Sequence, residues 1–422
     1  MRFLFVHQNF PGQFRHVARH LAGQAGHTVL AMCDAANLER GKGLHERMTI
    51  AGYRTPAPGE PATHSYLRDT QAHIRRGQHV LGAVRQLRAK GYVPDVVVAH
   101  SGWGEALFLR DAYPAARHIH YCEYYYHAQG ADVGFDPEYP SGPNDGPRIL
   151  VRNTTALLSL AQCDAGIAPT EWQRSLYPPE WQAKISVMHE GVDTAAVKPD
   201  PHAQLRIGDA VLRAGDEIVT FVARNLEPYR GFHTFMRALA ALQALRPAAR
   251  VVIVGGDDVS YGRRLRDGAT YRQLYMDEAD HPDQAQRVDW SKVHFLGKVP
   301  HAQFVKVLQV SAVHAYLTYP FVLSWSMLEA MAAGCLLVAS DTAPVREVIR
   351  DGENGLLVDF FDAAALAAKL AQALAQRAAL APLRVQARAH IVRHYDLATV
   401  CGPAWVRFLT QPPISPGPMP RA

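Results

Sequence analysis

The chain has few cysteines, and none of them are paired in a motif. Its 422 residues include five cysteines, and no two form a CxxC pair. An odd number of cysteines scattered through apolar segments is typical of buried thiols, which argues against a disulfide framework or a zinc site. We therefore expect a protein of a reducing compartment, the cytoplasm. The five positions are Cys33, Cys122, Cys163, Cys335 and Cys401.

The sequence also lacks a long uninterrupted hydrophobic run. Although 48% of the residues are hydrophobic, no apolar stretch approaches the roughly 20 residues of a membrane-spanning helix. The opening MRFLFVHQ is too short and too polar for a signal sequence, and it is typical of a strand. We therefore expect neither a spanning helix nor an export signal.

Charge of either sign is moderate. The formal net charge is +5 and 20% of the residues are charged. This weak basic excess suits anionic ligands or an anionic membrane surface, but it is too small for a nucleic-acid interface. Nucleic acid is therefore not an expected partner. The composition and length favour a globular protein with two full domains rather than a disordered or fibrous chain.

Several common cofactor and metal motifs are missing. The sequence has no GxGxxG fingerprint, which removes support for a nicotinamide enzyme, and no HExxH. It also has no Asp-x-Asp at a strand end that could hold a divalent cation on a nucleotide, because the adjacent Asp257 and Asp258 diverge in an extended chain. The sequence predicts no resident metal and no cofactor.

The most informative stretch runs from Thr318 to Arg350, and it predicts a loop, a helix over 324–333 and a short buried strand. Ser324 suits the N-cap of this helix, and Gly334 suits its end because glycine tolerates positive φ. Glu329 is a carboxylate in an otherwise apolar helix. The helix start could hold a diphosphate while Glu329 accepts hydrogen bonds from ribose hydroxyls. The simpler alternative is a solvated glutamate.

The segment LEAMAAGCLLVAS, with DTAPVREVIRDGENGLLV after it, resembles the donor-site signature of the retaining glycosyltransferases of sequence family four. That family usually carries two glutamates separated by seven residues, the first near the donor sugar and the second on the ribose. Glu329 matches the second, whereas Phe321 stands where the first would be. The resemblance implies the α/β fold called GT-B, in which two Rossmann-like domains with parallel sheets face a central cleft and a C-terminal helix crosses back to the first domain.

The resemblance also implies where the domains divide. Residues 1–197, completed by 396–422, are expected to form an acceptor-side domain, and residues 198–395 a nucleotide-sugar donor domain. Glu190 begins a segment, EGVD, that resembles the family's asparagine-glycine-valine-aspartate hinge, with glutamate in place of asparagine.

The loop after the first expected strand has a turn, NFPG, that leads into an amphipathic helix. Ligands of parallel sheets bind at the carboxyl ends of the strands, so Gly12 and Gln13 are expected to line the cleft. The alternative is that Gly12 only makes a turn.

Two further strands, over 95–99 and 118–122, end in the polar and aromatic sequences HSGWG and EYYYH at the same edge of the sheet. Family-four enzymes commonly place a histidine at the end of the second strand, where this chain has Glu123, with His127 four residues on. Either residue could hydrogen-bond the donor sugar or deprotonate the acceptor hydroxyl. Both are therefore candidate catalytic residues, although tyrosine-rich segments also fill cores.

The loop after the first strand of the second domain, RNLEPYRGF, carries two arginines. A guanidinium matches phosphate oxygens and stays charged, so Arg224 and Arg230 are expected to clamp a diphosphate. The family uses an arginine and a lysine here; Arg230 replaces the lysine. The resemblance implies a main-chain contact to the nucleobase at Val299. The expected donor-binding set is Arg224, Arg230, Val299, Leu323, Ser324 and Glu329.

Three other segments also carry expectations. The aperiodic loop over 130–148 predicts an acceptor-side lid. The charged stretch over 260–292 predicts a surface excursion without evident chemistry. The basic helix over 71–91 could contact an anionic membrane, which would suit a lipid-linked acceptor, or it could simply be an outer helix.

These observations predict a retaining, metal-independent glycosyltransferase that moves a sugar from a nucleotide diphosphate sugar to a hydroxyl of a glycan or lipid-linked glycan, in cell-surface polysaccharide biosynthesis. Phe321 motivates a different reading, a non-catalytic protein of the same fold that binds nucleotide or a partner enzyme. A phosphorylase and a nucleotide-sugar epimerase of this fold are two further candidates.

Overall fold

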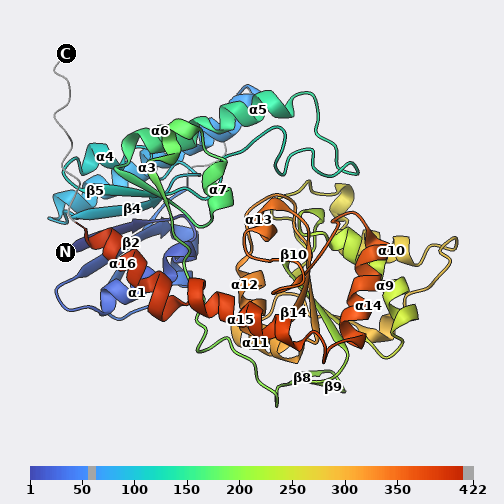
Figure 1. The fold of residues 1–422 in the computed structure, drawn as a ribbon. Coiled ribbons are helices and arrows are strands. Elements are labelled where there is room, and N and C mark those ends of the chain that lie inside the picture. The colour runs from blue at the N-terminus through green and yellow to red at the C-terminus, as the bar shows by residue number, and fades with distance from the viewer. Residues whose placement is uncertain (56–62, 412–422) are drawn as a thin grey trace. The chain divides into compact units, whose positions relative to one another are not determined.

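The computed structural model describes residues 1–55 and 63–411, which form two compact units (Figure 1). The first unit comprises residues 1–128 and 140–191 together with the chain from Leu397; the second comprises Gln129–Tyr139 and Val192–Asp396. The chain enters the second unit after Gly191, a few residues before the expected boundary at 197. The expected domain end at 422 lies outside the described residues.

The first unit is built on a seven-stranded parallel sheet. The central strands are continuous apolar runs, as expected for strands that are buried on both faces. The strand order is β3-β2-β1-β4-β5-β6-β7. The strands are β1 (Arg2–Val6), β2 (Thr28–Asp34), β3 (Met48–Tyr53), β4 (Val96–His100), β5 (Arg117–Tyr121), β6 (Ala165–Ala168) and β7 (Ile185–Val187).

Helices cover both faces of this sheet (Figure 1). The C-terminal helix α16 packs beside α1, and its Trp405 is buried in a cluster with Phe14 and Tyr121. The return of the C-terminal helix to the first domain is therefore confirmed. The helices are α1 (Arg15–Gly23), α2 (Leu38–Gly41), α3 (Arg68–Ala89), α4 (Leu109–Ala112), α5 (Asp145–Arg152), α6 (Thr154–Gln162), α7 (Glu171–Ser175), α8 (Pro179–Gln182) and α16 (Gly402–Thr410).

The second unit has a six-stranded parallel sheet in the order β12-β11-β10-β13-β14-β15 and a separate antiparallel hairpin, β8-β9. The strands are β8 (Gln204–Ile207), β9 (Ala210–Arg213), β10 (Ile218–Asn225), β11 (Arg250–Gly256), β12 (Val293–Phe295), β13 (Val313–Tyr316), β14 (Leu336–Ser340) and β15 (Leu356–Val358).

Helices also flank this second sheet (Figure 1). Helix α9 packs against α10 and α14, and α12 packs against α15. The helices are α9 (Phe232–Leu245), α10 (Tyr271–Ala279), α11 (His301–Val310), α12 (Trp325–Ala332), α13 (Ala343–Arg346), α14 (Ala363–Ala375) and α15 (Ala381–Tyr395).

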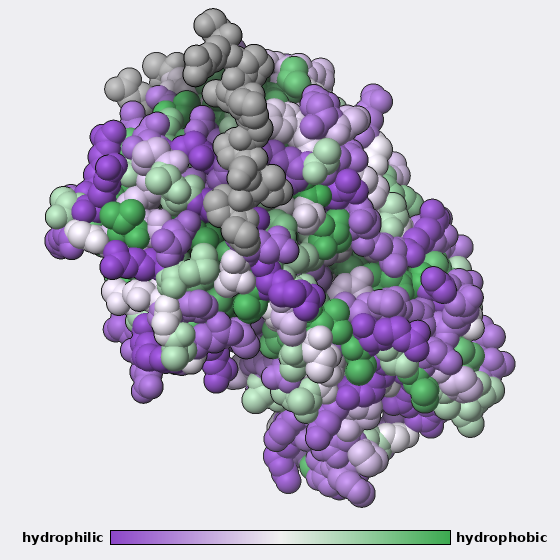
Figure 2. Space-filling model, turned by 60° about the vertical axis from the view of Figure 1, so that its left-hand side comes forward, coloured by the Kyte–Doolittle hydropathy of each residue, from purple (hydrophilic) through white to green (hydrophobic). Residues whose placement is uncertain are grey.

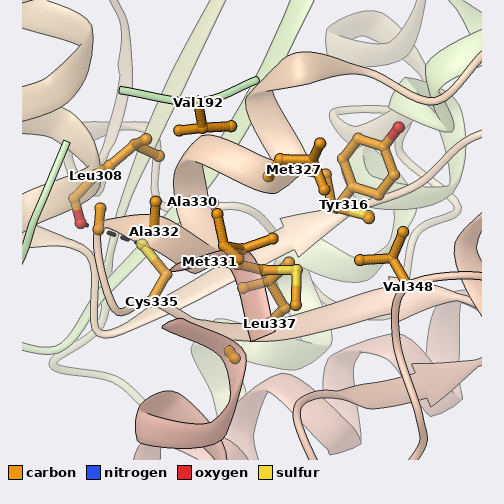
Figure 3. Close-up of a cluster of buried hydrophobic side chains, with 14 of the residues drawn as sticks. Val192, Leu308, Tyr316, Met327, Ala330, Met331, Ala332, Cys335, Leu337 and Val348 are labelled. Atoms are coloured by element: carbon orange, nitrogen blue, oxygen red, sulfur yellow. Dashed lines mark hydrogen bonds between the residues drawn. The ribbon is translucent and has the colours of Figure 1, made fainter. Parts of the chain in front are cut away.

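Helix α12 is fixed by a buried apolar cluster (Figure 3). Met327 and Met331 from the helix pack with Leu337 from β14, and the Cys335 thiol donates to the Leu308 carbonyl at 3.2 Å. Gly334 ends the helix with φ of 77°, as the sequence predicted. All five cysteines are buried and free, in agreement with their interpretation as buried thiols.

The exposed surface is mixed in character. On the face shown in Figure 2, hydrophobic residues form small areas among hydrophilic ones. Across residues 1–55 and 63–411, every helix falls short of the length and hydropathy that crossing a bilayer requires.

Candidate functional site

In the first unit, the candidate residues lie where the strand order of the sheet reverses. Strands β1 and β4 are neighbours, with crossovers leaving them in opposite directions, and β5 follows β4. Loops at such a switch point diverge and leave a crevice at the carboxyl ends of the strands, where α/β sheets bind ligands. Gln13 and Glu123 follow β1 and β5, and His100 is the last residue of β4.

Glu123 is held by two side chains, one from the segment after β1 and one from the end of β4. The Gln13 amide donates to Glu123 Oε1 at 2.7 Å, and His100 Nε2 lies 3.1 Å from Glu123 Oε2. The side-chain oxygen of Gln13 in turn lies 2.7 Å from His7 Nε2. The structure thus brings together Gln13 and Glu123, two residues that the sequence placed at this edge of the sheet.

Backbone contacts determine which ring nitrogens carry the protons in this network. The Nδ1 atoms of His7 and His100 accept hydrogen bonds from the N–H groups of Asn9 and Gly102, at 2.9 and 3.1 Å. In the neutral imidazoles, Nε2 therefore carries the proton. His7 donates to Gln13, whose amide donates to Glu123, and His100 donates to Glu123 directly.

This arrangement favours an ionised carboxylate. Burial acts to raise the pKa of Glu123, but the hydrogen bond and charge of His100, with the Gln13 amide, hold it below its usual value of 4.5. Burial, reinforced by the neighbouring His100, lowers the pKa of His7 to about 3. At neutral pH the network therefore consists of a neutral His7 and an anionic Glu123, whose side chain is 28% exposed.

Gly12 does more than make a turn. Its φ is +44°, and a Cβ at this position would lie 2.7 Å from the His7 ring. Any larger residue would push the ring out of the network, so the glycine is required where the chain passes His7.

His127 has a different environment from Glu123. Its Nε2 lies 2.7 Å from the Leu176 carbonyl, to which it donates, and its ring packs against Tyr125. This hydrogen bond ties two loops together, so the geometry favours Glu123 over His127 as the reactive group. His7, His100 and Trp103, which stacks on His100 at 3.7 Å, are members of the site that sequence reasoning did not select, although each follows a strand end.

In the second unit, the corresponding reversal lies between β10 and β13. Arg230 ends the 3₁₀ helix Pro228–Arg230 after β10 and donates through Nη1 to Thr318 Oγ1 at 2.7 Å and to the Val322 carbonyl at 3.0 Å. These bonds join the loop after β10 to the loop after β13, which leads into α12.

The Arg230 guanidinium is buried without an acidic partner. The residue is only 7% exposed, yet none of the ion pairs formed by the described residues includes it, and its hydrogen bonds to those residues use Nη1 alone. A buried cation normally carries a counter-ion because desolvating its charge is costly. Arg230 therefore offers Nε and Nη2 to an anion.

Aromatic rings surround this guanidinium. The Arg230 Cζ atom lies 5.5 Å from the Tyr261 ring centroid and 6.0 Å from that of Phe321. Phe321 also meets Tyr229 and Tyr261 edge-on, at 5.5 and 4.9 Å between centroids. The stretch over 260–292 was expected to be a surface excursion without evident chemistry. At Tyr261 it is not a detached excursion, because this ring packs against Arg230.

Most of the other residues expected to bind the sugar donor lie on β10, on α12 and in the segment before α12. Arg224 is exposed at the end of β10, and the Leu323 side chain is buried in the core cluster beneath α12. Ser324 caps α12 as predicted, accepting from the Ser326 N–H at 3.3 Å.

Glu329 is tied to the start of α11. Its Oε1 lies 2.6 Å from His301 Nε2, and its side chain is 19% exposed. His301 begins α11 two residues after Val299, whose side chain packs against the core. The residues expected to meet the ribose and the nucleobase therefore lie on adjoining elements, and the apolar side chain of Val299 leaves its main chain for recognition.

The segment Gln129–Tyr139 was expected to be part of a lid of the first domain, but it is a packed part of the second unit. Asp136 accepts from Tyr319 at 2.6 Å and pairs with His233 Nε2 at 3.0 Å, while Tyr229 donates to Asp132 at 3.0 Å. The hydroxyl groups of Tyr229 and Tyr319 thus donate to buried carboxylates. The expected loop also ends early, because α5 starts at Asp145.

One group of side chains in this region has the spacing of metal ligands. Asp136, Glu138 and His233 place ligand atoms within 4.8 Å of one another. The Glu138 carboxylate, however, is engaged by both terminal nitrogens of Arg237, at 2.7 and 3.1 Å. The guanidinium already supplies the positive charge, so these residues do not fit a metal ion.

The basic helix α3 uses part of its charge internally. Arg76 and Arg88 donate to the carbonyls of Trp103 and Ala112, while Arg85 and Lys90 are exposed. Its buried face carries Val80 and Val84. The helix is therefore an outer layer of the sheet whose solvent face keeps some positive charge.

Comparisons with known proteins identify a family and a fold. A family model described as glycosyl transferase family 4 group matches residues 25–197, and one described as glycosyl transferases group 1 matches residues 207–390. Together the two matches span most of the chain.

Similar proteins include the phosphatidyl-myo-inositol mannosyltransferase of Mycobacterium leprae, 30% identical over 209 residues, which cover 50% of this chain and 48% of that protein. The D-inositol 3-phosphate glycosyltransferase of Nocardia farcinica is 28% identical over 252 residues, 58% of this chain and 52% of that protein. The chain thus spans about half the length of the curated relatives it matches.

Solved structures match almost the whole chain. HepE of Anabaena in complex with UDP-glucose aligns with a TM-score of 0.66 at 16% identity, covering 97% of this chain and 99% of that one. Sucrose-phosphate synthase of Thermosynechococcus elongatus aligns with a TM-score of 0.69 at 19% identity, over 97% and 98% of the two chains. The expected GT-B fold is confirmed.

Proposed function

The chain belongs to the family-four glycosyltransferases with a group 1 C-terminal domain, and we propose that it transfers a sugar from a nucleotide diphosphate sugar to a hydroxyl group of a glycan or lipid-linked glycan. Relatives named for inositol glycosyl and mannosyl transfer support a sugar donor and a hydroxyl acceptor. A structural neighbour, HepE, binds UDP-glucose in its crystal structure.

The observation that carries this proposal is the buried guanidinium of Arg230, which has no acidic partner within residues 1–55 and 63–411. A diphosphate would supply the missing negative charge and accept hydrogen bonds from Nε and Nη2. When the bond between the sugar and the diphosphate breaks, negative charge builds on the leaving oxygen, and a fixed cation beside it stabilises that charge. The start of α12, reached from Arg230 through the Val322 carbonyl, adds a second positive potential.

Glu329 is proposed to accept hydrogen bonds from the ribose hydroxyls, with the main chain at Val299 against the base. Its present contact, His301, is 59% exposed, so a ribose can share or replace that hydrogen bond at low cost. Exposed Arg224 is proposed to add a longer-range attraction for the diphosphate.

In the first unit, Glu123 is proposed to bind a substrate hydroxyl as a hydrogen-bond acceptor and to take up its proton as the new bond forms. Two donors fix its oxygens, so the carboxylate is oriented before substrate arrives. Its lowered pKa makes it ionised throughout the neutral range but a weak base, which suits late proton transfer.

Retention of anomeric configuration and independence from metal ions are further parts of the proposal, supported by family membership and by the cationic residues near the leaving group. A role in cell-surface polysaccharide synthesis, a cytoplasmic location and a weak contact of α3 with anionic lipid are proposed on the same basis. The exposed Arg85 and Lys90 support the lipid contact.

A thermal-shift screen against UDP, GDP and ADP, followed by turnover assays with their sugar conjugates, tests the proposal. We expect one nucleotide series to raise the melting temperature, since a ligand that binds only the native state stabilises it. Binding without hydrolysis or transfer for every donor and acceptor would favour a non-catalytic protein. Strict dependence on phosphate would indicate a phosphorylase, and turnover of a nucleotide sugar with no acceptor would indicate an epimerase.

A further inference from the structure

We propose that Tyr261 is a specificity-determining residue that packs its ring against the transferred sugar, so that a neutral pyranose is recognised by aromatic faces rather than by a carboxylate. The inference rests on the proposed function and names how the sugar end of the donor is held.

The position of Tyr261 follows from the proposed diphosphate anchor. In a nucleotide diphosphate sugar the sugar is joined directly to the outer phosphate, so it must lie within a few ångströms of the group that binds that phosphate. The ring centroid of Tyr261 lies 5.5 Å from the Arg230 Cζ atom. The nucleoside end of the donor is assigned to Val299, which follows β12, and to Glu329 on α12. The Tyr261 ring instead contacts Phe321, which follows β13, so it lies among different elements.

Tyr261 belongs to a loop whose backbone is held in place. Glu227, which is fully buried, accepts hydrogen bonds from the N–H groups of Ser260, Tyr261 and Gly262 at 3.0, 3.0 and 2.9 Å. Asn225 adds a bond to the Ser260 hydroxyl at 2.7 Å. A buried carboxylate that accepts three backbone N–H groups fixes the loop strongly. The ring is therefore presented by a built loop rather than by a mobile excursion.

The side chains around Tyr261 determine the kind of ligand that can bind there. Phe321 is 4% exposed and Tyr261 is 37% exposed, so part of the Tyr261 ring is accessible beside the buried Phe321 and the half-buried Tyr229. An accessible aromatic ring suits the C–H surface of a pyranose, and the phenol hydroxyl can bond one ring substituent. Phe321 contacts the rings of Tyr229 and Tyr261 and the guanidinium of Arg230, so these neighbours present aromatic and cationic groups.

The test measures the sugar increment, defined as the Kd of a nucleoside diphosphate divided by the Kd of its glucose conjugate, by calorimetry on the full chain with UDP, GDP and ADP. We expect Tyr261→Ala to lower the increment about 3- to 10-fold while the affinity for the nucleoside diphosphate changes less than twofold. Tyr261→Phe should retain most of the increment, because it keeps the ring.

Two further variants separate stacking from damage to the loop. Leu274→Ala, at a 41% exposed position of α10 in the same excursion, should leave both affinities unchanged. Glu227→Gln weakens a carboxylate that accepts three backbone hydrogen bonds from the loop. Because Glu227 is a positioning residue that acts through this loop, the variant should have a lower sugar increment and an unchanged affinity for the nucleoside diphosphate.

An unchanged increment in Tyr261→Ala would overturn the proposal, because the ring would then lie outside the sugar site. Equal losses for the diphosphate and its sugar conjugate would also overturn it, since Tyr261 would then support only Arg230. Wild-type protein that binds a nucleotide but shows no increment would refute this inference alone. Failure to bind any of the three nucleotides would refute the proposed function as well.

Discussion

The two switch points of this molecule differ in how completely their polar groups are paired. In the first unit, His7, Gln13, His100 and Glu123 satisfy one another, and the carboxylate is oriented in advance. In the second unit, Arg230 is buried with one nitrogen bonded to the described residues and with no carboxylate among them beside it. This difference fits the roles proposed above: directed hydrogen bonding and proton transfer in the first unit, and binding of an anion in the second.

Glu123→Gln is expected to have the largest effect and tests the role proposed for the first site. The amide keeps the shape but loses the charge and the ability to take a proton, so we expect the transfer rate to fall about 100- to 1,000-fold, within the range of a lost general base. The affinity for nucleoside diphosphates should change less than twofold. Steady-state kinetics and calorimetry measure the two quantities.

His127→Gln is the matched control for this variant, because the His127 ring donates to a carbonyl and ties two loops together; its rate should fall less than threefold. A larger loss with His127→Gln than with Glu123→Gln would reverse the assignment of the reactive residue.

Arg230→Ala tests the anion site. Losing a charge-assisted contact worth about 1.5 to 3 kcal/mol should weaken nucleoside diphosphate binding roughly 10- to 100-fold. Inorganic pyrophosphate should show the same loss, whereas exposed Arg224→Ala should cost only about 2- to 5-fold. The unliganded melting temperature serves as the control for folding. Undiminished pyrophosphate binding by the Arg230 variant would remove the basis of the donor site.

A buried histidine on β13 gives a pH prediction for the second unit. Burial lowers the pKa of His314 from 6.5 to about 3, so between these pH values the unfolded chain binds more protons. Stability therefore falls as the pH drops through this window, by roughly 2 kcal/mol for this group at pH 5.

His314→Leu should reduce the difference in unfolding free energy between pH 7 and pH 5 by about that amount, as measured by urea denaturation. The exposed His202→Leu should keep the wild-type difference. The idea fails if the two variants show the same pH dependence.

Glu329→Ala is expected to have a smaller effect than Arg230→Ala. One lost hydrogen bond to a ribose hydroxyl should weaken nucleoside diphosphate binding about 3- to 10-fold. Pyrophosphate, which has no ribose, should bind the variant and the wild type equally. A matching loss for pyrophosphate would place Glu329 at the phosphates instead.

Sequence is most informative in this protein where local pattern decides structure. Continuous apolar runs predict the central strands, and the carboxyl-edge rule places Gln13 and Glu123 at one edge of the first sheet. Strand β3 is harder to predict because its residues are mostly half-buried and show no clear pattern.

The features that sequence could not predict depend on contacts between distant residues. Asp136 and Tyr319 are 183 positions apart, and Glu227 and Tyr261 are 34 apart. No local periodicity signals such pairs. His7 and His100, in contrast, could have been found, because each stands at a strand end where polar residues are rare unless they face a ligand.

The assignment of Gln129–Tyr139 to the second unit has a consequence for synthesis on the ribosome. The second unit needs a segment that is translated before its main body, and the first unit needs α16, which is translated after the second unit. Neither unit can be complete until the other has largely emerged from the exit tunnel, so no single cut would yield two intact halves.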